Sequence, residues 1–294
     1  MNQQTPKVAF LNFFRGFLKK PGIERQLAKL IRKDNQASLV ISKLVPNHYQ
    51  YAKKTFRSTA VGSVKMNLDV SDYMGHEAYF GYHESETRRL LGLAETNNTV
   101  FDIGANIGFT CLRLKEKVGT GGQVYAFEPD MYNFEQLSKN MNLNPELPIT
   151  IFNFGMGQTK ERHKLTFDTA DNRGGGRIND QTDGSFNWIE VTTLDLFVEE
   201  QNIPKIDLIK IDVEGFEYQV LLGGKEIIQK WRPTLFIELS DANLQRQHAS
   251  ASMLITFLEE YYPVIIHAFT GERIHRNSDF KNCHFDIIAR QAEH

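Results

Sequence analysis

The ten residues FDIGANIGFT (101–110) place Asp102 directly before a turn that holds two glycines four positions apart. The apolar run TVFDI (99–103) predicts a strand before the turn, and apolar residues at helical spacing from 107 to 118 predict a helix after it. Gly104 suits the sharp turn because it has no Cβ atom. Gly108 allows the start of the helix to pack closely on a strand or a ligand. Such a turn is typical of the ligand-binding edge of a parallel sheet.

Short apolar runs alternate with helical patterns from Thr99 to the end of the chain. The predicted strands are TVFDI (99–103), QVYAFE (123–128), ITIFNF (149–154), DLIKIDV (207–213), TLFIEL (234–239), PVIIHAF (263–269) and FDIIAR (285–290). A polar, glycine-rich stretch at 155–190 interrupts the alternation. The pattern predicts an α/β fold with a largely parallel sheet and helices on both of its faces.

The first sixty residues differ in charge and pattern from the rest of the chain. They hold twelve Lys or Arg and two acidic residues, a balance of +10, whereas the remainder of the 294-residue chain has a balance of −12. Apolar residues at helical spacing in 8–20 and 23–33 predict two amphipathic helices. We therefore predict a basic, amphipathic helical module at 1–65 and a second domain at 66–294.

Composition and charge exclude several classes of protein. The two cysteines form no CxxC motif and lie near no pair of histidines, which disfavours a zinc site and a disulfide framework and predicts a reducing, cytoplasmic compartment. No apolar run approaches the roughly 20 residues that span a bilayer. The negative balance after residue 60 argues against nucleic acid as a partner. For residues 8–45 the alternatives are packing on the second domain, a homodimer contact, or peripheral contact with the inner surface of a membrane.

The second predicted strand ends in Glu128, twenty residues after Gly108. An acid at this position is well placed to accept hydrogen bonds from ribose hydroxyls. The free N–H groups at the start of the helix after Gly108 favour a carboxylate or a phosphate, and the negative charge of Asp102 suits a ligand ammonium group. Together these features indicate a nucleoside-bearing cofactor. The spacing GANIG is not GxGxxG, which weakens the case for a dinucleotide.

Longer motifs extend this pattern along most of the chain. VFDIGANIGFT, VYAFEPD, TLDLF, IDLIKIDVEGFEYQVLLGG and PTLFIEL occur in this order. Together they resemble the FkbM family of S-adenosylmethionine-dependent methyltransferases, over roughly residues 68–290. The resemblance implies the class I methyltransferase fold, a Rossmann-like sheet of seven strands with the last one antiparallel. The N-terminal helical extension lies outside it, and 66–294 becomes the methyltransferase domain.

The resemblance also implies which residues bind the cofactor. Asp102, Gly104, Asn106 and Gly108 would border the methionine half of S-adenosylmethionine, and Glu128 would hold its ribose. Asn153, at the end of the third strand, is expected near the adenine, with a plain turn residue as the alternative. Glu84 would approach the cofactor from the N-terminal side, with a solvated surface acid as the alternative.

The fourth predicted strand, DLIKIDVEGFE, is unusually charged for a buried parallel strand. Lys210, Asp212 and Glu214 alternate with apolar residues, so all three side chains share one face as long as the strand continues. Asp212 is the first choice for a base that takes the proton of an acceptor hydroxyl. Lys210 would orient that base or stabilise charge on the acceptor oxygen, and Glu214 would assist. The alternative is an ion-pair cluster that closes the end of the sheet.

A divalent cation is the rival explanation for these acids. Asp212, Glu214 and Glu238 offer the oxygen ligands that magnesium or calcium prefers. The lysine two positions before Asp212 disfavours this reading, because its ammonium group would repel a divalent ion. We therefore predict no metal site and S-adenosylmethionine as the cofactor.

The function that follows is an O-methyltransferase for a hydroxyl of a sugar, glycan, glycolipid or polyketide-like acceptor. Two alternatives stay open. One is an NAD-dependent oxidoreductase on a Rossmann sheet, and the other is a non-catalytic binding module that retains the cofactor fold.

Overall fold

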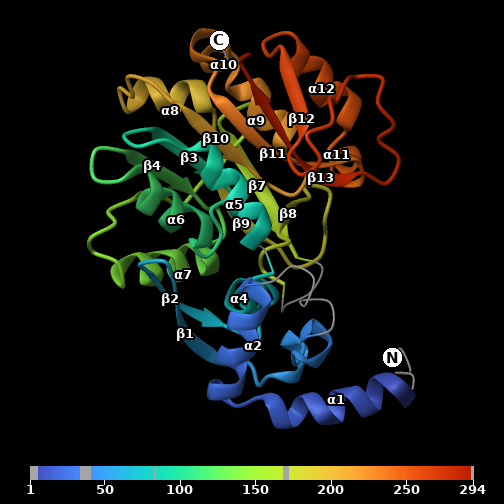
Figure 1. The fold of residues 1–294 in the computed structure, drawn as a ribbon. Helices are drawn as coiled ribbons and strands as arrows, with labels where there is room; N and C mark the ends of the chain where they lie inside the picture. Colours follow the sequence, from blue (N-terminus) through green and yellow to red (C-terminus); the bar gives the residue numbers. More distant parts are fainter. Residues whose placement is uncertain (1–5, 34–40, 83, 168–171, 293–294) are drawn as a thin grey trace. The chain divides into compact units, whose positions relative to one another are not determined.

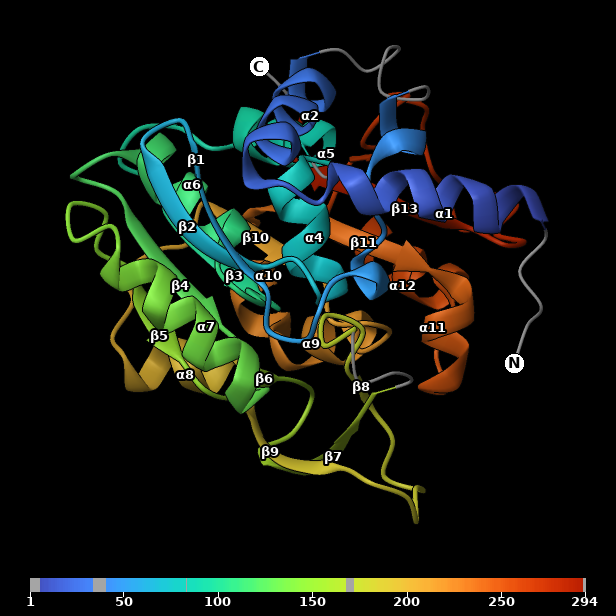
Figure 2. The same cartoon turned by 90° about the horizontal axis from the view of Figure 1, so that it is seen from below.

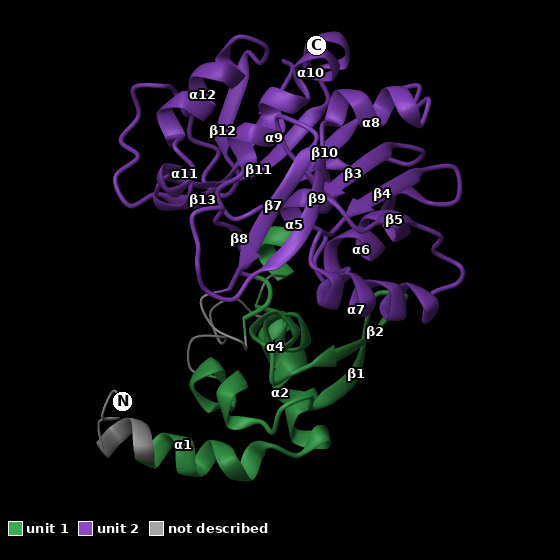
Figure 3. Ribbon diagram, turned by 180° about the vertical axis from the view of Figure 1, so that it is seen from behind, with its two compact units in different colours: residues 1–87, 169–174 green, residues 88–168, 175–294 purple. Residues whose placement is uncertain are grey.

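The computed structural model describes residues 6–33, 41–82, 84–167 and 172–292. The chain forms two compact units (Figure 3). Unit 1 comprises Met1–Thr87 with Thr169–Gly174, and unit 2 comprises Arg88–Asp168 with Gly175–His294. The predicted boundary at residue 65 is therefore wrong, because more than twenty further residues pack with the N-terminal part.

Unit 2 is built on one sheet of seven strands (Figure 1). Their order is β12-β13-β11-β10-β3-β4-β5, and β13 runs antiparallel to both of its neighbours. This confirms the predicted sheet with an antiparallel last strand. The strands are β3 (Thr99–Ile103), β4 (Gln123–Phe127), β5 (Thr150–Phe152), β10 (Leu208–Ile211), β11 (Thr234–Ser240), β12 (Val264–His267) and β13 (His284–Arg290).

The two faces of this sheet carry different helices. On one face, Phe101 and Ile103 of β3 share a core with apolar residues from α8, α9, α10 and α12. Asp102 alternates with these residues and therefore faces the other side, where Thr110 of α6 donates a hydrogen bond to it. Helices thus cover both faces, as predicted. The helices of unit 2 are α6 (Phe109–Val118), α7 (Met131–Asn142), α8 (Leu194–Glu200), α9 (Glu217–Gly223), α10 (Lys225–Trp231), α11 (Asp241–Arg246) and α12 (Ala251–Glu259); α5 (Glu84–Leu93) begins in unit 1 and ends in unit 2.

The polar stretch at 155–190 does not remain irregular. It forms a four-stranded sheet in the order β6-β9-β7-β8, in which β7 and β9 run side by side as an antiparallel pair (Figure 2). Leu165, Ile189 and Val191 give this sheet a small core of its own. Its strands are β6 (Gly155–Met156), β7 (Glu161–Thr166), β8 (Arg177–Ile178) and β9 (Asn187–Thr192).

Unit 1 contains the two predicted N-terminal helices, but it is not purely helical. The strands β1 (Phe56–Val61) and β2 (Val64–Asp69) pair as a hairpin, which corrects the prediction of a helical module over 1–65. A buried ion pair joins Glu24 to Arg57 at 2.6 Å, so the second helix is tied to the hairpin. The other elements are α1 (Pro6–Leu18), α2 (Pro21–Lys33), the 3-10 turns η1 (Ser42–Leu44) and η2 (His48–Gln50), and α4 (Tyr73–Phe80).

Among the described residues, none of the helices combines the length and apolar character that crossing a bilayer requires.

Candidate active site

The glycine turn after β3 sits against the end of β10. Gly104 has a φ of +83°, and a Cβ atom there would lie 1.9 Å from the carbonyl oxygen of Asp212. The N–H groups of Gly104 and Ala105 both donate to the carbonyl of Phe127 at the end of β4. Only glycine fits this close approach. The turn is therefore fixed between the carboxyl ends of three strands, where ligands bind in such sheets.

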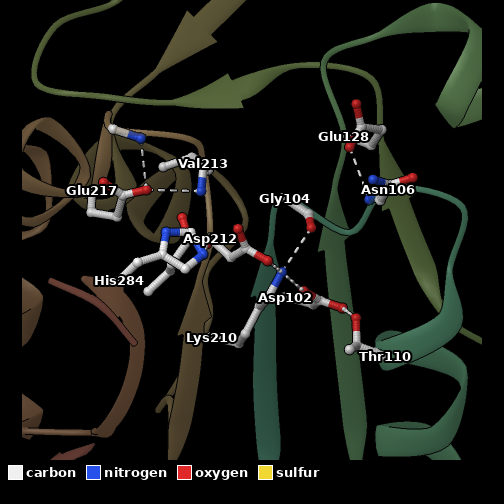
Figure 4. A network of polar contacts seen from close by, with 12 residues as sticks. Asp102, Gly104, Asn106, Thr110, Glu128, Lys210, Asp212, Val213, Glu217 and His284 are labelled. Carbon is white, nitrogen blue, oxygen red and sulfur yellow. Dashed lines mark hydrogen bonds and ion pairs between the residues drawn. The ribbon is translucent and has the colours of Figure 1, made fainter. Parts of the chain in front are cut away.

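Lys210 connects the turn to two carboxylates (Figure 4). Its side chain is nearly buried, and its Nζ donates to the carbonyl of Gly104 at 2.8 Å. The same ammonium lies 3.1 Å from Asp212 Oδ2 and 3.4 Å from Asp102 Oδ1. One cation therefore lies between two acids and offsets part of their charge, which lowers the cost of burying Asp102.

The two acids differ in exposure. The side chain of Asp102 is fully buried, whereas that of Asp212 is 38% exposed. Thr110 donates to Asp102 Oδ2 at 2.6 Å. Burial raises the pKa of Asp102, and the charge of Lys210 acts against this rise. The ammonium group that faces Asp102 in the structure is that of Lys210, and contact of Asp102 with the ammonium group of the cofactor stays a prediction. Of the two carboxylates on Lys210, Asp212 is the one that solvent reaches.

Glu214 does not lie on the strand face that it was predicted to share. The strand β10 ends at Ile211, and Glu214 adopts a left-handed φ of +54°. Its Oε2 accepts a hydrogen bond from Asn243 Nδ2 at 3.0 Å. Burial, reinforced by the nearby charge of Asp212, raises the pKa of Glu214 to about 7. Glu214 is thus close enough for the charge of Asp212 to affect its pKa, but its position is fixed by the turn and by Asn243 of α11.

Glu217 shapes the same turn and was not among the predicted residues. Its Oε1 accepts from the N–H groups of Val213 and Gly215, at 3.1 and 3.0 Å. The side chain is buried, and burial raises the pKa of Glu217 to about 7. It holds the segment just after Asp212, so it is a positioning residue. The motif DVEGFE contained the signal, because an acid at the start of a helix suits free N–H groups nearby.

The predicted ribose acid, Glu128, braces the glycine turn from the other side. Its Oε2 accepts from the N–H of Asn106 and its Oε1 from the N–H of Asp130, both at 2.9 Å. Burial raises the pKa of Glu128 to about 7. Each carboxylate oxygen has a second lone pair, so Glu128 still has capacity to accept hydrogen bonds from a ligand.

Asn106 offers a buried acceptor to the cofactor turn. It lies in the turn with a left-handed φ of +51°, and its side-chain Oδ1 is buried without a hydrogen-bond partner. Buried polar atoms are normally paired, so an orphaned acceptor in a binding turn calls for a donor from a ligand. The donors of S-adenosylmethionine, its ammonium and ribose hydroxyls, are of the right kind. The residues present therefore fit this cofactor.

Two other predicted cofactor residues pack against protein. A Cβ at Gly108 would lie 2.6 Å from Leu137 of α7, so this glycine serves helix packing. Asn153 uses its Nδ2 to donate to the carbonyls of Glu128 and Pro129, at 2.9 and 3.1 Å. Its amide nitrogen thus holds the end of β4, and contact with adenine stays a prediction for the rest of its side chain.

Glu84 lies in unit 1, as the first residue of α5, and it is buried. The alternative of a solvated surface acid is therefore wrong. Its approach to the cofactor stays a prediction, because the site described above belongs to unit 2.

The rival metal site depends on Glu238. Its Oε1 lies 3.5 Å from His284 Nε2. Burial and then the charge of Asp212 raise the pKa of Glu238 well above its usual range. Within the described residues, no group of three or more His, Cys, Asp or Glu side chains is arranged to hold a metal ion.

Sequence reasoning missed four residues around Asp212 and its neighbours. Only Glu217 and Thr110 carried a local signal, since Thr110 follows the glycine turn in the first turn of a helix. Asn243 and His284 reach the site from β11–α11 and β13, far away along the chain.

Comparison with known proteins assigns the class. The family model described as the methyltransferase FkbM domain matches residues 102–262, which begins at the buried acid of β3 and includes the whole Lys210 network. The seven-stranded sheet with its antiparallel β13 has the class I methyltransferase arrangement that the motifs predicted. The chain belongs to the FkbM methyltransferase family.

Three individual proteins are similar to this chain at 19 to 31% identity. The hexuronic acid methyltransferase AglP of Haloferax volcanii is 31% identical over 143 residues, which cover 48% of this chain and 56% of that protein. The 2-O-methyltransferase NoeI of Sinorhizobium fredii is 25% identical over 192 residues, covering 59% of this chain and 76% of that protein. The solved structure of methyltransferase FkbM from Methylobacillus flagellatus aligns with a TM-score of 0.43 at 19% identity, over 74% of this chain and 55% of that one. The chain thus spans little more than half the length of the first of these relatives.

Proposed function

We propose that this protein transfers a methyl group from S-adenosylmethionine to a hydroxyl of a sugar or glycan, including glycolipid or polyketide-like acceptors that present such a hydroxyl. The observation that carries the proposal is the position of Asp212. It is the accessible carboxylate of the Asp102–Lys210–Asp212 network, next to the glycine turn of the cofactor loop.

Asp212 is suited to the role of general base. A hydroxyl acceptor must lose its proton during or after methyl transfer, and a carboxylate within hydrogen-bonding reach accepts it. The ammonium of Lys210 at 3.1 Å limits the rotation of this carboxylate and fixes the direction in which it faces. Because Lys210 is also bonded to Gly104, the base and the cofactor turn are held in one fixed arrangement.

The cofactor residues are those of the turn and the end of β4. Asn106 and Glu128 have acceptor capacity for an ammonium group and ribose hydroxyls. When bound, S-adenosylmethionine supplies an electrophilic methyl group on a sulfonium. The chain's part in the reaction is to orient the acceptor oxygen and to accept its proton at Asp212.

The acceptor class rests on the relatives. AglP is named for methylation of a hexuronic acid and NoeI for 2-O-methylation. The name of NoeI is consistent with a hydroxyl acceptor, and the name of AglP gives a sugar acid as acceptor without the oxygen that is methylated. The family match disfavours the NAD-dependent alternative. Formation of a methylated product in the assay below would decide against the non-catalytic module.

The test is an acceptor screen with the full chain. The protein is incubated with S-adenosylmethionine and a panel of uronic acids, hexoses and glycans, and products are analysed by mass spectrometry for one added methyl group. We expect methyl ethers of at least one uronic acid or hexose, with the methyl on oxygen by fragmentation. Methylation of nitrogen or carbon acceptors alone would overturn the proposal, and binding of the cofactor without any product would favour the non-catalytic module.

A further inference from the structure

The helix α1 presents a continuous aromatic surface to solvent. Phe10, Phe13, Phe14 and Phe17 lie at positions i, i+3, i+4 and i+7, so they share one side of the helix. Their exposed fractions are 67%, 64%, 49% and 60%. Neighbouring rings contact each other edge to face, with centroids 4.8 to 5.9 Å apart. We call this surface the phenylalanine face.

The opposite side of α1 anchors it within unit 1. Arg15 Nε donates to the carbonyl of Lys43 at 2.9 Å, and Gln50 Nε2 donates to the carbonyl of Asn12 at 3.1 Å. Just past the helix end, Lys19 Nζ donates to the carbonyl of Gln50 at 2.7 Å. A surface helix normally packs through its apolar side and leaves its polar side in water. Here the polar side makes the contacts, and the apolar side is turned away from unit 1.

The N-terminal segment that carries the phenylalanine face is strongly basic. Residues 1–60 hold twelve Lys or Arg against two acidic residues. Lys20, Arg25 and Lys29 are exposed, and α2 adds the partly exposed apolar side chains of Ile23 and Leu30. A segment that exposes both aromatic side chains and lysines or arginines is the combination that binds anionic membrane surfaces.

We propose that the phenylalanine face docks on an anionic phospholipid bilayer, with α1 lying in the interface. Its 13 residues are too few to span the hydrocarbon core. The net charge selects this occupant over a second copy of the chain, because two copies would bring two segments of +10 together, whereas acidic headgroups neutralise them. The inference goes beyond methyl transfer and does not depend on the acceptor.

The test is sedimentation of the full chain with vesicles. We expect binding to phosphatidylcholine vesicles that contain phosphatidylglycerol, little binding to phosphatidylcholine alone, and weakening by salt. The double variant Phe13→Ser/Phe17→Ser should bind roughly tenfold or more weakly, because two interfacial anchors are lost. Lys20→Glu/Lys29→Glu should weaken binding and reduce its salt dependence. The matched control is Met253→Ser, which removes an exposed apolar side chain of α12 and should bind like the native chain.

All the substituted side chains are exposed, so thermal unfolding and circular dichroism should be unchanged. Equal vesicle binding by the phenylalanine double variant and the native chain would overturn the proposal. So would failure of the native chain to bind anionic vesicles. A native dimer in analytical ultracentrifugation that the double variant abolishes would assign the face to a second copy instead.

Discussion

At the scale of single residues, the exposure of Asp212 separates it from the other acids of the site. Asp102 has the same cationic partner but no access to solvent, and Glu217 is committed to two backbone N–H groups. The chemistry of the site therefore depends on a carboxylate that is both oriented and reachable. The buried acids around it hold the turn.

The base hypothesis is tested by Asp212→Asn. The change keeps the size of the side chain and an oxygen that can accept a hydrogen bond from Lys210, but it removes the proton affinity. We expect turnover to fall by roughly 10²–10⁴, the usual contribution of acid–base catalysis, with cofactor affinity and unfolding midpoint little changed. Single-turnover kinetics and calorimetry with S-adenosylmethionine measure the two quantities. Asp183→Asn, an exposed change in a loop, is the control.

The same assay addresses the metal rival. If Asp212 acts as a base, a chelator should leave turnover unchanged, because the ammonium of Lys210 at 3.1 Å from the carboxylate would repel a divalent ion. Loss of activity on chelation with recovery on added magnesium would instead assign Asp212, Glu214 and Glu238 to a cation. Near-native turnover of Asp212→Asn would defeat both ideas.

The raised pKa of Glu217 predicts that the free energy of unfolding depends on pH. Burial raises its pKa from 4.5 to about 7, so the folded state binds this proton more tightly than the unfolded state. Its contribution to stability is therefore full below the unfolded pKa and is lost as pH rises through the folded one. Glu217→Gln cannot ionise and keeps an oxygen for the two N–H groups. At about pH 8 it should be more stable than the native protein by up to roughly 3 kcal/mol, and near pH 4.5 the two should converge.

Urea unfolding across this pH range measures the Glu217→Gln effect. The control is Glu199→Gln, which changes an exposed carboxyl on α8 and should follow the native curve. Parallel curves for the native protein and Glu217→Gln would show that Glu217 does not titrate in this window.

At the scale of elements, the site depends on how closely β3 and β10 meet. The turn at Gly104 touches the backbone of Asp212, so strand ends from two separate βα units are locked together. This explains why a short glycine turn in the sequence has consequences at a residue more than one hundred positions later.

Gly104→Ala should therefore disturb both stability and catalysis. Its Cβ would meet the carbonyl oxygen of Asp212 at 1.9 Å, and its φ of +83° is unfavourable for alanine. We expect a loss of about 1–3 kcal/mol in the free energy of unfolding and a loss of turnover as Asp212 shifts. Gly92→Ala is the matched control, because no atom lies within 4 Å of its Cβ position in α5. It should gain up to about 1 kcal/mol. Equal stabilities for the two variants would contradict this account.

The sequence predicted the central strands well, because they are buried on both faces and read as apolar runs. It failed where strands are short or half-exposed. The hairpin β1–β2 was overlooked although Val64, Met66 and Leu68 alternate as buried residues. The strands β6 and β8 have two residues each, too few to give a period.

The candidate site was predictable in part for a similar reason. Lys210 lies in β10 and Asp212 is the first residue after it. The alternation of side chains along a strand therefore predicts correctly that the two side chains lie on the same face. Glu214 was misplaced because a left-handed residue redirects the chain, and the glycine at 215 was the only local sign of a turn. Burial separates Asp102 from Asp212, and burial depends on packing that sequence spacing does not contain.

At the scale of the whole molecule, charge and chemistry are segregated. The excess of positive charge in residues 1–60 and the phenylalanine face belong to unit 1, whereas the network of Asp102, Lys210 and Asp212, with Asn106 and Glu128, belongs to unit 2. A chain of two compact units need not unfold in a single transition. The cofactor should therefore raise the melting temperature of the unit that binds it, and this shift shows which unit holds the site.

We expect S-adenosylmethionine and its demethylated product to raise the melting temperature of the transition that unfolds unit 2, and NAD to leave it unchanged. At a concentration one hundred times the dissociation constant, the stabilisation is about 2.7 kcal/mol. Glu128→Ala should shrink this ligand-induced increment, because about 1.5–3 kcal/mol of binding is lost with two charge-assisted hydrogen bonds. The increment is the quantity to compare, since Glu128 also accepts N–H groups from Asn106 and Asp130 and its removal lowers the baseline stability. Glu135→Ala, an exposed change on α7, should keep the full increment. Differential scanning calorimetry with hydrogen exchange assigns the transition to a unit. An increment confined to unit 1 would place the cofactor elsewhere, and an equal increment with NAD would contradict the choice of S-adenosylmethionine.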